Sequence, residues 1–222
     1  MHGGTFRVRQ RTAQSLGRDP DVGFILSNAE RLVKVATVCV ISFGLADGLN
    51  EATTASPDES DDWKQAVAGF RGDNLMMAAL RTALLLDRAE TKVSFQAVYR
   101  RLKEPTVREG LLQVLAERYG DDDLFPPARD SRIDEFFYAY SELDWKVHGR
   151  LMHFRNLGIA HLTPVNMSKS VTFEELRTLI GIIGRLALIL QRLCQTQTAF
   201  RDYTGGDYRE IARKTMMRRP AS

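Results

Sequence analysis

Residues 172–200 read TFEELRTLIGIIGRLALILQRLCQTQTAF, one of the two most apolar stretches of the 222-residue chain. Thr172 and Glu175 have the spacing of a capping box, which marks the start of a helix. The apolar residues that follow include Ile180, Ile182, Ile183 and Leu186 to Leu190. Because such a helix has little polar surface, we expect it to lie at the centre of the fold.

Helix signals also dominate the rest of the chain. Caps and apolar repeats predict further helices over residues 27–50, 63–90, 94–103 and 105–119. The longest repeat starts at Ser131 and keeps three- to four-residue spacing to Phe154, as one face of a helix does. No stretch alternates with the two-residue period of a strand. The expected fold class is therefore all-α, a bundle of four long helices with additional short ones.

The positive charge of the chain is concentrated at its two ends. The whole sequence has a net charge of +3, whereas residues 1–20 carry +3 and residues 208–222 carry +4, so the remainder is acidic at −4. A nucleic-acid binder usually has a basic footprint, and here the ends supply it. We expect a basic tail over residues 1–20, one helical domain over residues 21–205 and a basic C-terminal tail over residues 206–222.

The cysteines and the apolar stretches bear on the cellular compartment. Cys39 and Cys194 lie in apolar runs without the Cys/His spacing of a zinc site, which indicates small buried thiols in a reducing compartment. The first 20 residues lack the apolar stretch of a signal peptide. They are arginine-rich like a transit peptide, but we interpret them as a disordered tail. Charged residues interrupt each apolar run before it reaches membrane-spanning length. We expect a cytoplasmic protein with no membrane partner.

Arg155 and His161 are the main candidates for chemistry. A guanidinium can grip a phosphate, and an imidazole with a pKa near ~6.5 can move a proton at neutral pH. On a continuous helix the two side chains would point about 240° apart. Gly158 weakens the helix and Pro164 ends it, so His161 can fold back toward Arg155. This pair suits RNA cleavage without a metal ion. The alternative is that both side chains only cap carbonyls or pair with a carboxylate.

Two further polar residues precede Arg155 on the same predicted helix. Asp144 and His148 would lie within about 40° of Arg155 around the helix axis, so they are candidates for a supporting role. The alternative is a simple Asp144–His148 pair at i, i+4 spacing. The sequence contains neither a Gly-x-Ser-x-Gly elbow nor a phosphate-binding loop. We therefore expect no cofactor and no metal ion.

Two blocks of the sequence resemble one known family. Residues 154–161, FRNLGIAH, resemble the Arg-x(4–6)-His signature of the HEPN superfamily, with the polar Asn156 directly after the arginine. Residues 75–103 resemble the helix, the Leu-Asp break and the short Ser-capped helix of its AbiU-type abortive-infection branch. Together the blocks and the sequence between and around them cover about residues 25–200.

The resemblance implies a helical homodimer in which two signatures face one cleft. In active family members the cleft is a metal-independent endoribonuclease that leaves a 2′,3′-cyclic phosphate. His161 would be the general acid/base, Arg155 would stabilise the charged phosphorane, and Asn156 would orient a phosphate or the histidine. The partners would be RNA and a cognate antitoxin, in a toxin–antitoxin or anti-phage system. Thr163 departs from the tyrosine that some of these toxins carry two residues after the histidine.

Two other readings of the same residues remain. Many members of the superfamily are catalytically silent, so the chain would then be a homodimeric binding module for a partner protein or a nucleotide. The third possibility is a structural helical bundle without a binding or catalytic function, in which Arg155 and His161 would only cap the end of a helix.

Overall fold

The computed structural model describes residues 19–89, 91–119, 126–159, 171–196 and 205–217. Within these ranges the chain forms eight α-helices and one π-helix, and it has no strand. The expected all-α bundle is confirmed.

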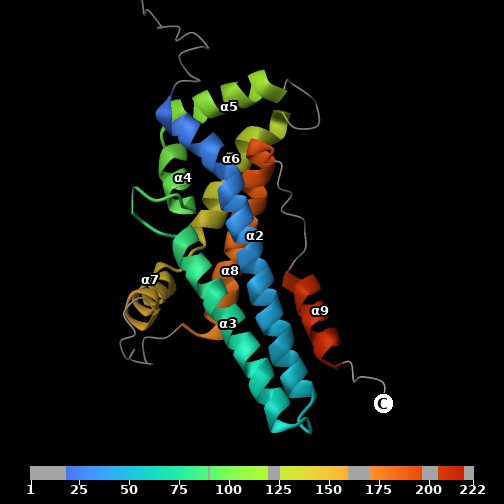
Figure 1. Ribbon diagram of the computed structural model, residues 1–222. Helices are drawn as coiled ribbons and strands as arrows, with labels where there is room; N and C mark the ends of the chain where they lie inside the picture. The colour runs from blue at the N-terminus through green and yellow to red at the C-terminus, as the bar shows by residue number, and fades with distance from the viewer. Residues whose placement is uncertain (1–18, 90, 120–125, 160–170, 197–204, 218–222) are drawn as a thin grey trace, which may run out of the picture.

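Two long antiparallel helices, α2 and α3, run along the molecule and organise the remaining elements (Figure 1). Helix α8 lies along α2 and also packs on α6, while α9 packs on the far half of α2. Helix α7 stands beside α3 (Figure 1). The elements in chain order are α2 (Pro20–Ala55), α3 (Asp61–Leu85), α4 (Phe95–Leu102), α5 (Pro105–Tyr119), α6 (Pro126–Ser141), α7 (Trp145–His153), η1 (Phe154–Ile159), α8 (Phe173–Cys194) and α9 (Gly205–Met217).

Side-chain caps start several helices where the sequence predicts them. The capping box of Thr172 and Glu175 is present at α8, and Ser94 accepts a hydrogen bond from Ala97 N at the start of α4. The predicted start of α2 at Ser27 is wrong. Asp19 caps this helix, and Ser27 lies about two turns inside it, where its hydroxyl donates to the carbonyl of Gly23. A serine hydroxyl can be satisfied in this way within a helix, so the capping pattern alone was misleading.

The predicted continuous helix from Ser131 to Phe154 is also wrong, because the chain breaks between α6 and α7. Asp144 has an extended backbone, with φ −77° and ψ 99°, and its carboxylate accepts hydrogen bonds from the backbone N–H groups of Lys146 and Val147. The apolar repeat continues through the break because residues on both sides of it face the same core: Leu143 and Val147 are both buried.

Helix α8 lies at the centre of the core, as its apolar sequence predicts. It contacts α2 on one side and α6 on the other. Its buried residues are Leu176, Leu179, Ile180, Ile182, Ile183, Leu186, Ala187, Leu190, Leu193 and Cys194. Burial raises the pKa of the Cys194 thiol to about 12 and that of Cys39 to about 11, so both behave as small apolar side chains.

Helix α2 has an unusual composition for its length. Among the helices that the structure describes, it alone is long and apolar enough to cross a membrane. Within the fold, 61% of its most apolar stretch is buried against other helices, as in the core helix of a globular domain.

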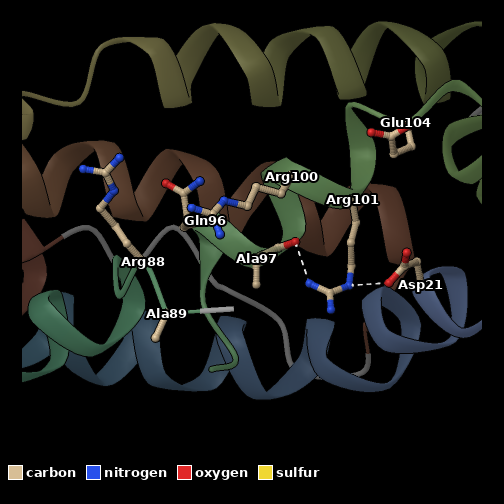
Figure 2. A pocket seen from close by; sticks show the side chains of 8 residues that line it. All are labelled: Asp21, Arg88, Ala89, Gln96, Ala97, Arg100, Arg101 and Glu104. Carbon is tan, nitrogen blue, oxygen red and sulfur yellow. Dashed lines mark hydrogen bonds and ion pairs between the residues drawn. The ribbon is translucent and has the colours of Figure 1, made fainter. Parts of the chain in front are cut away.

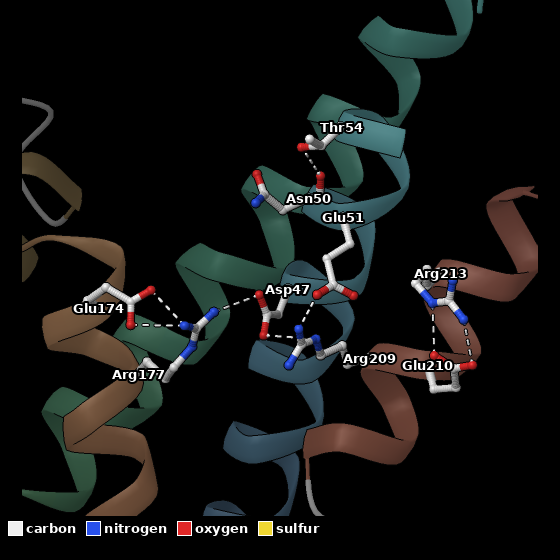
Figure 3. A network of polar contacts seen from close by, with 9 residues as sticks. All are labelled: Asp47, Asn50, Glu51, Thr54, Glu174, Arg177, Arg209, Glu210 and Arg213. Carbon is white, nitrogen blue, oxygen red and sulfur yellow. Dashed lines mark hydrogen bonds and ion pairs between the residues drawn. The ribbon is translucent and has the colours of Figure 1, made fainter. Parts of the chain in front are cut away.

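Residues 206–222 were expected to form a basic tail, and most of them belong to a helix that packs on α2. Asp47 of α2 is buried and accepts from Arg177 of α8 at 2.9 Å, while Arg209 of α9 lies 3.5 Å from its other oxygen (Figure 3). Arg209 also pairs with Glu51. The buried carboxylate is thus paired on both sides, which offsets the cost of removing it from water.

Gly48 lets the two backbones approach closely at this contact. A Cβ atom at this position would overlap the carbonyl of Arg209 and lie 2.9 Å from the Cβ of Ala212. Ala212 itself is buried against α2 and α3, in a small apolar cluster with Leu49 and Val67. The absence of a side chain at residue 48 is therefore a requirement for docking α9.

Replacing Gly48 by alanine should weaken the packing of α9 by about 1–3 kcal/mol, the usual cost of overpacking. Urea denaturation and hydrogen exchange of the α9 amides would measure the effect. Gly23→Ala is a matched control on the same helix, because a Cβ there meets nothing within 4 Å. Equal stability and equal α9 protection in the two variants would contradict the account.

Candidate functional site

Arg155 lies in the π-helix η1, which continues α7 without a break. Its Nη1 donates to Oδ2 of Asp87 at 3.3 Å, and its Nε donates to Oδ1 of Asn156 at 3.0 Å. Asp87 directly follows the C-cap residue of α3, Leu86. The ion pair therefore connects the end of α3 to η1. Short π-helical turns are rare and often occur at functional sites, where they change the direction of a side chain.

Asp87 is itself held in place by the turn in which it lies. Its Oδ1 accepts from Ala89 N at 2.9 Å, and its backbone carbonyl accepts from the Ser94 hydroxyl at 2.7 Å. Ser94 is completely buried and also caps α4. Arg155 is thus positioned by a carboxylate that has little freedom to move.

An open pocket of about 520 Å³ lies beside this ion pair. Its charged lining residues are Arg31 from α2, Lys92 from the turn after α3, Arg155 and Asp87. Among the residues that the structure describes, neither Arg31 nor Lys92 has an ion-pair partner. The remaining walls are mainly apolar: Leu32, Val35, Leu84, Leu85 and Val93. Three cations against one carboxylate favour an anionic ligand, and the apolar walls suit a ligand with a nonpolar part.

His148 is the second notable side chain near Arg155. It is 4% exposed, and its Nε2 has no hydrogen-bond partner within the described part of the chain. Its ring packs edge-on against Trp145, with the centroids 5.3 Å apart. Burial lowers the pKa of His148; the charge of Arg88 lowers it further, Asp87 acts in the opposite direction, and Arg155 adds a smaller lowering. His148 is therefore a neutral imidazole at pH 7.

The other sequence-predicted residues have separate places. Asp144 does not use its carboxylate to pair with His148, because that group caps α7 through the backbone N–H groups of Lys146 and Val147. Asn156 is exposed and acts as an acceptor for Arg155. His161 lies outside the residues that the structure describes, as does Thr163. A role for His161 in catalysis stays a prediction.

The sequence analysis missed Asp87, Arg31 and Lys92. Asp87 was noted only as part of the break that ends α3, and nothing in its spacing points to Arg155, 68 residues later. Arg31 is a charge within the apolar stretch of α2. Its position is the one feature of the sequence that could have identified it as a site residue, because a charged side chain in an apolar helix usually reaches solvent or a partner.

No group of three or more His, Cys, Asp or Glu residues that could hold a metal ion occurs within the described ranges. Comparisons with protein families, curated proteins and solved structures found no match for this chain. Its function is therefore inferred from its own residues, and the family resemblance stays a prediction.

The buried His148 predicts a specific loss of stability at acidic pH. The unfolded chain binds a proton at His148 near the ordinary pKa of ~6.5, whereas the folded chain binds it only at lower pH. Acidification from pH 7.5 to 5.5 should therefore favour unfolding, and His148→Leu should reduce this pH dependence. Urea denaturation at the two pH values measures this change in the free energy of unfolding, with His153→Leu on the same helix as the control. A pH dependence unchanged by His148→Leu would refute the assignment.

Proposed function

We propose that the chain is a metal-independent endoribonuclease of the HEPN type that acts as a toxin or anti-phage effector. His161 is the general acid/base, Arg155 stabilises the charge on the phosphate, and Asn156 orients the reacting groups. The supporting observation is the position of Arg155 in an open pocket with a surplus of cations, held there by the ion pair with Asp87. RNA is the substrate, and a cognate antitoxin is a further partner.

The reaction follows from the chemistry of these groups. An imidazole removes the proton of a 2′-hydroxyl, whose oxygen attacks the adjacent phosphorus. The resulting phosphorane gains negative charge, which the Arg155 guanidinium stabilises. An imidazolium then protonates the departing 5′-oxygen, which gives a 2′,3′-cyclic phosphate and a 5′-hydroxyl. General acid–base help of this kind contributes about 10²–10⁴-fold to the rate.

Arg155 retains a free donor group for a phosphate. Its Nη1 and Nε have protein acceptors, whereas Nη2 makes no hydrogen bond to the part of the chain that the structure describes. A guanidinium can hold a carboxylate on one edge and a phosphate on another. Asp87 therefore orients the guanidinium without occupying all of it.

An exposed apolar stripe on α3 supports a homodimer. Phe70, Met77 and Leu84 recur every seven residues and are 60%, 42% and 53% exposed. Side chains at this spacing lie on one side of a helix and suit pairing with a second helix. Leu84 also lines the pocket of Arg155. A second copy of the chain, paired along this stripe, would therefore adjoin the candidate site.

One observation favours a different function. The Arg155 and Asp87 side chains are only 23% and 14% exposed, so their ion pair also has a structural role. A catalytically silent homodimer that binds a partner protein or a nucleotide would keep the same pair and the same pocket.

The nuclease proposal predicts cleavage of total RNA by the purified protein in the presence of EDTA. His161→Ala and Arg155→Ala should each reduce the rate by about 100-fold or more, because general acid–base and electrostatic help are lost. Arg185→Ala, an exposed arginine paired with Glu142, is the matched control and should keep full activity. Cleavage that persists in both site variants, or that requires added metal, would falsify the proposal.

The dimer proposal predicts twice the chain mass in analytical ultracentrifugation. Met77→Lys places a charge within the apolar stripe and should give monomers. Gln65→Lys adds the same charge at another exposed position of α3 and should leave the dimer intact. A monomeric wild-type protein, or a dimer unaffected by Met77→Lys, would rule out this interface.

A further inference from the structure

Two pockets border the turn that follows α3, and their walls differ in chemistry. Figure 2 shows the smaller pocket, of about 240 Å³, in which Arg101 donates to Asp21 at 2.8 Å and to the carbonyl of Ala97 at 3.0 Å. The charge of Arg101 is thus compensated within the fold. The apolar side chains among the described residues that line this pocket are only those of Ala89 and Ala97. The pocket of Arg155, in contrast, combines a surplus of cations with an extensive apolar wall.

The apolar wall of the Arg155 pocket is part of the hydrophobic core. Leu32 of α2 and Leu85 of α3 are each 2% exposed, and Val35 and Val93 are partly buried and pack against the same core. Side chains packed in this way have little freedom to collapse into the pocket. The wall is therefore a preformed apolar surface, and a ligand group that covers it is stabilised by the removal of water.

The dimensions of this wall favour a ring system as its ligand. On α2, Leu32 and Val35 are three residues apart, which is about 4.5 Å along the helix axis, and on α3, Leu84 and Leu85 are adjacent. A planar ring covers a surface of this extent, whereas an extended acyl chain is longer. Thr91 also lines the pocket, and a threonine hydroxyl can donate to or accept from the polar edge of such a ring.

The cations of the pocket directly adjoin the wall. Arg31 and Val35 are four residues apart on α2, so their side chains lie on the same face of the helix. Lys92 directly precedes Val93 in the turn after α3. A ligand that covers the wall with a ring therefore has its anionic group within reach of these cations only if the two parts are joined by a short connection.

The turn after α3 also fixes the wall relative to Arg155. Nη1 of Arg155 donates to Asp87, and the backbone carbonyl of Asp87 accepts from the Ser94 hydroxyl at 2.7 Å. Ser94 directly follows Val93, which belongs to the wall. The guanidinium and the wall thus line one pocket and are held by one turn. A nucleotide, in which one sugar joins the base to the phosphate, matches this combination.

We infer that the pocket of Arg155 holds a whole nucleotide unit of the RNA, with its phosphate at Arg155 and its nucleobase against the aliphatic wall of Leu32, Val35 and Leu84. This inference rests on the proposed function and specifies that the substrate is bound through a base as well as a phosphate. Because the pocket is open, the polar edges of the base keep contact with water or with Thr91. A purine should bind more tightly than a pyrimidine, because it covers more of the wall.

The test compares three uncleavable 2′-O-methyl ligands by isothermal titration calorimetry: an adenine dinucleotide, and the same molecule without its 5′ or without its 3′ base. Removing the base that covers the wall should weaken binding to the wild type about tenfold, because its apolar contact is lost. Removing the other base should have a much smaller effect. Uracil in place of the critical adenine should weaken binding, but less than removal of the base does.

Two valines of α2 supply a matched pair of variants. Val35→Phe fills the apolar part of the pocket, so it should weaken the intact dinucleotide to the affinity of the form without the critical base. That form should bind Val35→Phe as it binds the wild type, which also shows that the variant is folded. Val38→Phe adds the same ring at a position that is 42% exposed and does not line the pocket, and it should change neither affinity. Arg155→Ala should weaken all three ligands, because they share the phosphate.

Several results would overturn the inference. Wild-type protein that binds both base-free forms as tightly as the intact dinucleotide has no nucleobase subsite, and this comparison decides alone if Val35→Phe does not fold. Folded Val35→Phe that binds the intact dinucleotide as the wild type does would place the base elsewhere. Adenosine monophosphate tests a free nucleotide as the source of the base. If it binds more tightly than the dinucleotide and loses affinity in Val35→Phe, the pocket belongs to a free nucleotide and not to an RNA strand.

The base subsite and the nuclease can fail separately. Binding that depends on one base and on Val35, without cleavage of total RNA, supports the subsite and rejects the enzyme. Cleavage that needs Arg155 and His161, together with binding that is indifferent to both bases, supports the enzyme and rejects the subsite. A wild-type protein that binds no dinucleotide rejects the subsite, while the cleavage assay still decides on the nuclease.

Discussion

The ion pair between Asp87 and Arg155 is the interaction on which the candidate site depends. It connects the turn after α3 to the π-helix η1, two segments 68 residues apart in the sequence. Both side chains are mostly buried, so removing either one would leave the other charge poorly compensated. The pocket with Arg31 and Lys92 exists in its present form because this contact holds Arg155 against the end of α3.

Two arginine–carboxylate systems in this protein show how a structural contact differs from a candidate binding site. Around Asp47, carboxylates and guanidinium groups are matched, and every charge shown in Figure 3 has a partner within the fold. Around Asp87, three cations line one pocket with a single carboxylate. A matched network stabilises the packing of helices, whereas a surplus of one sign of charge at an open pocket attracts a ligand of the other sign. The surplus of positive charge in the pocket beside Asp87 therefore marks this pocket as the candidate site for an anionic ligand.

Local signals in the sequence predicted the fold class and several helix starts, because caps and apolar periodicity act within a few residues. Ser94 and the Thr172–Glu175 box were found in this way. The break at Asp144 was missed since α6 and α7 bury their apolar residues in the same core and keep the periodicity. Asp87 and Gly48 were missed for another reason: their partners, Arg155 and Arg209, come close only in the folded chain. The spacing of residues along the sequence does not indicate contacts between residues that are this far apart in the chain.

We propose above all that Asp87 holds Arg155 in position to receive a phosphate. The most direct test of this proposal is the Nε–H resonance of Arg155 in the ¹⁵N spectrum, assigned by Arg155→Lys, during titration with an uncleavable dinucleotide. We expect a resolved resonance in the free protein, because Nε donates to Asn156 and Nη1 to Asp87. We expect it to shift on binding while that of Arg185 stays in place. An Arg155 resonance that does not move as the dinucleotide saturates the protein would contradict the claim.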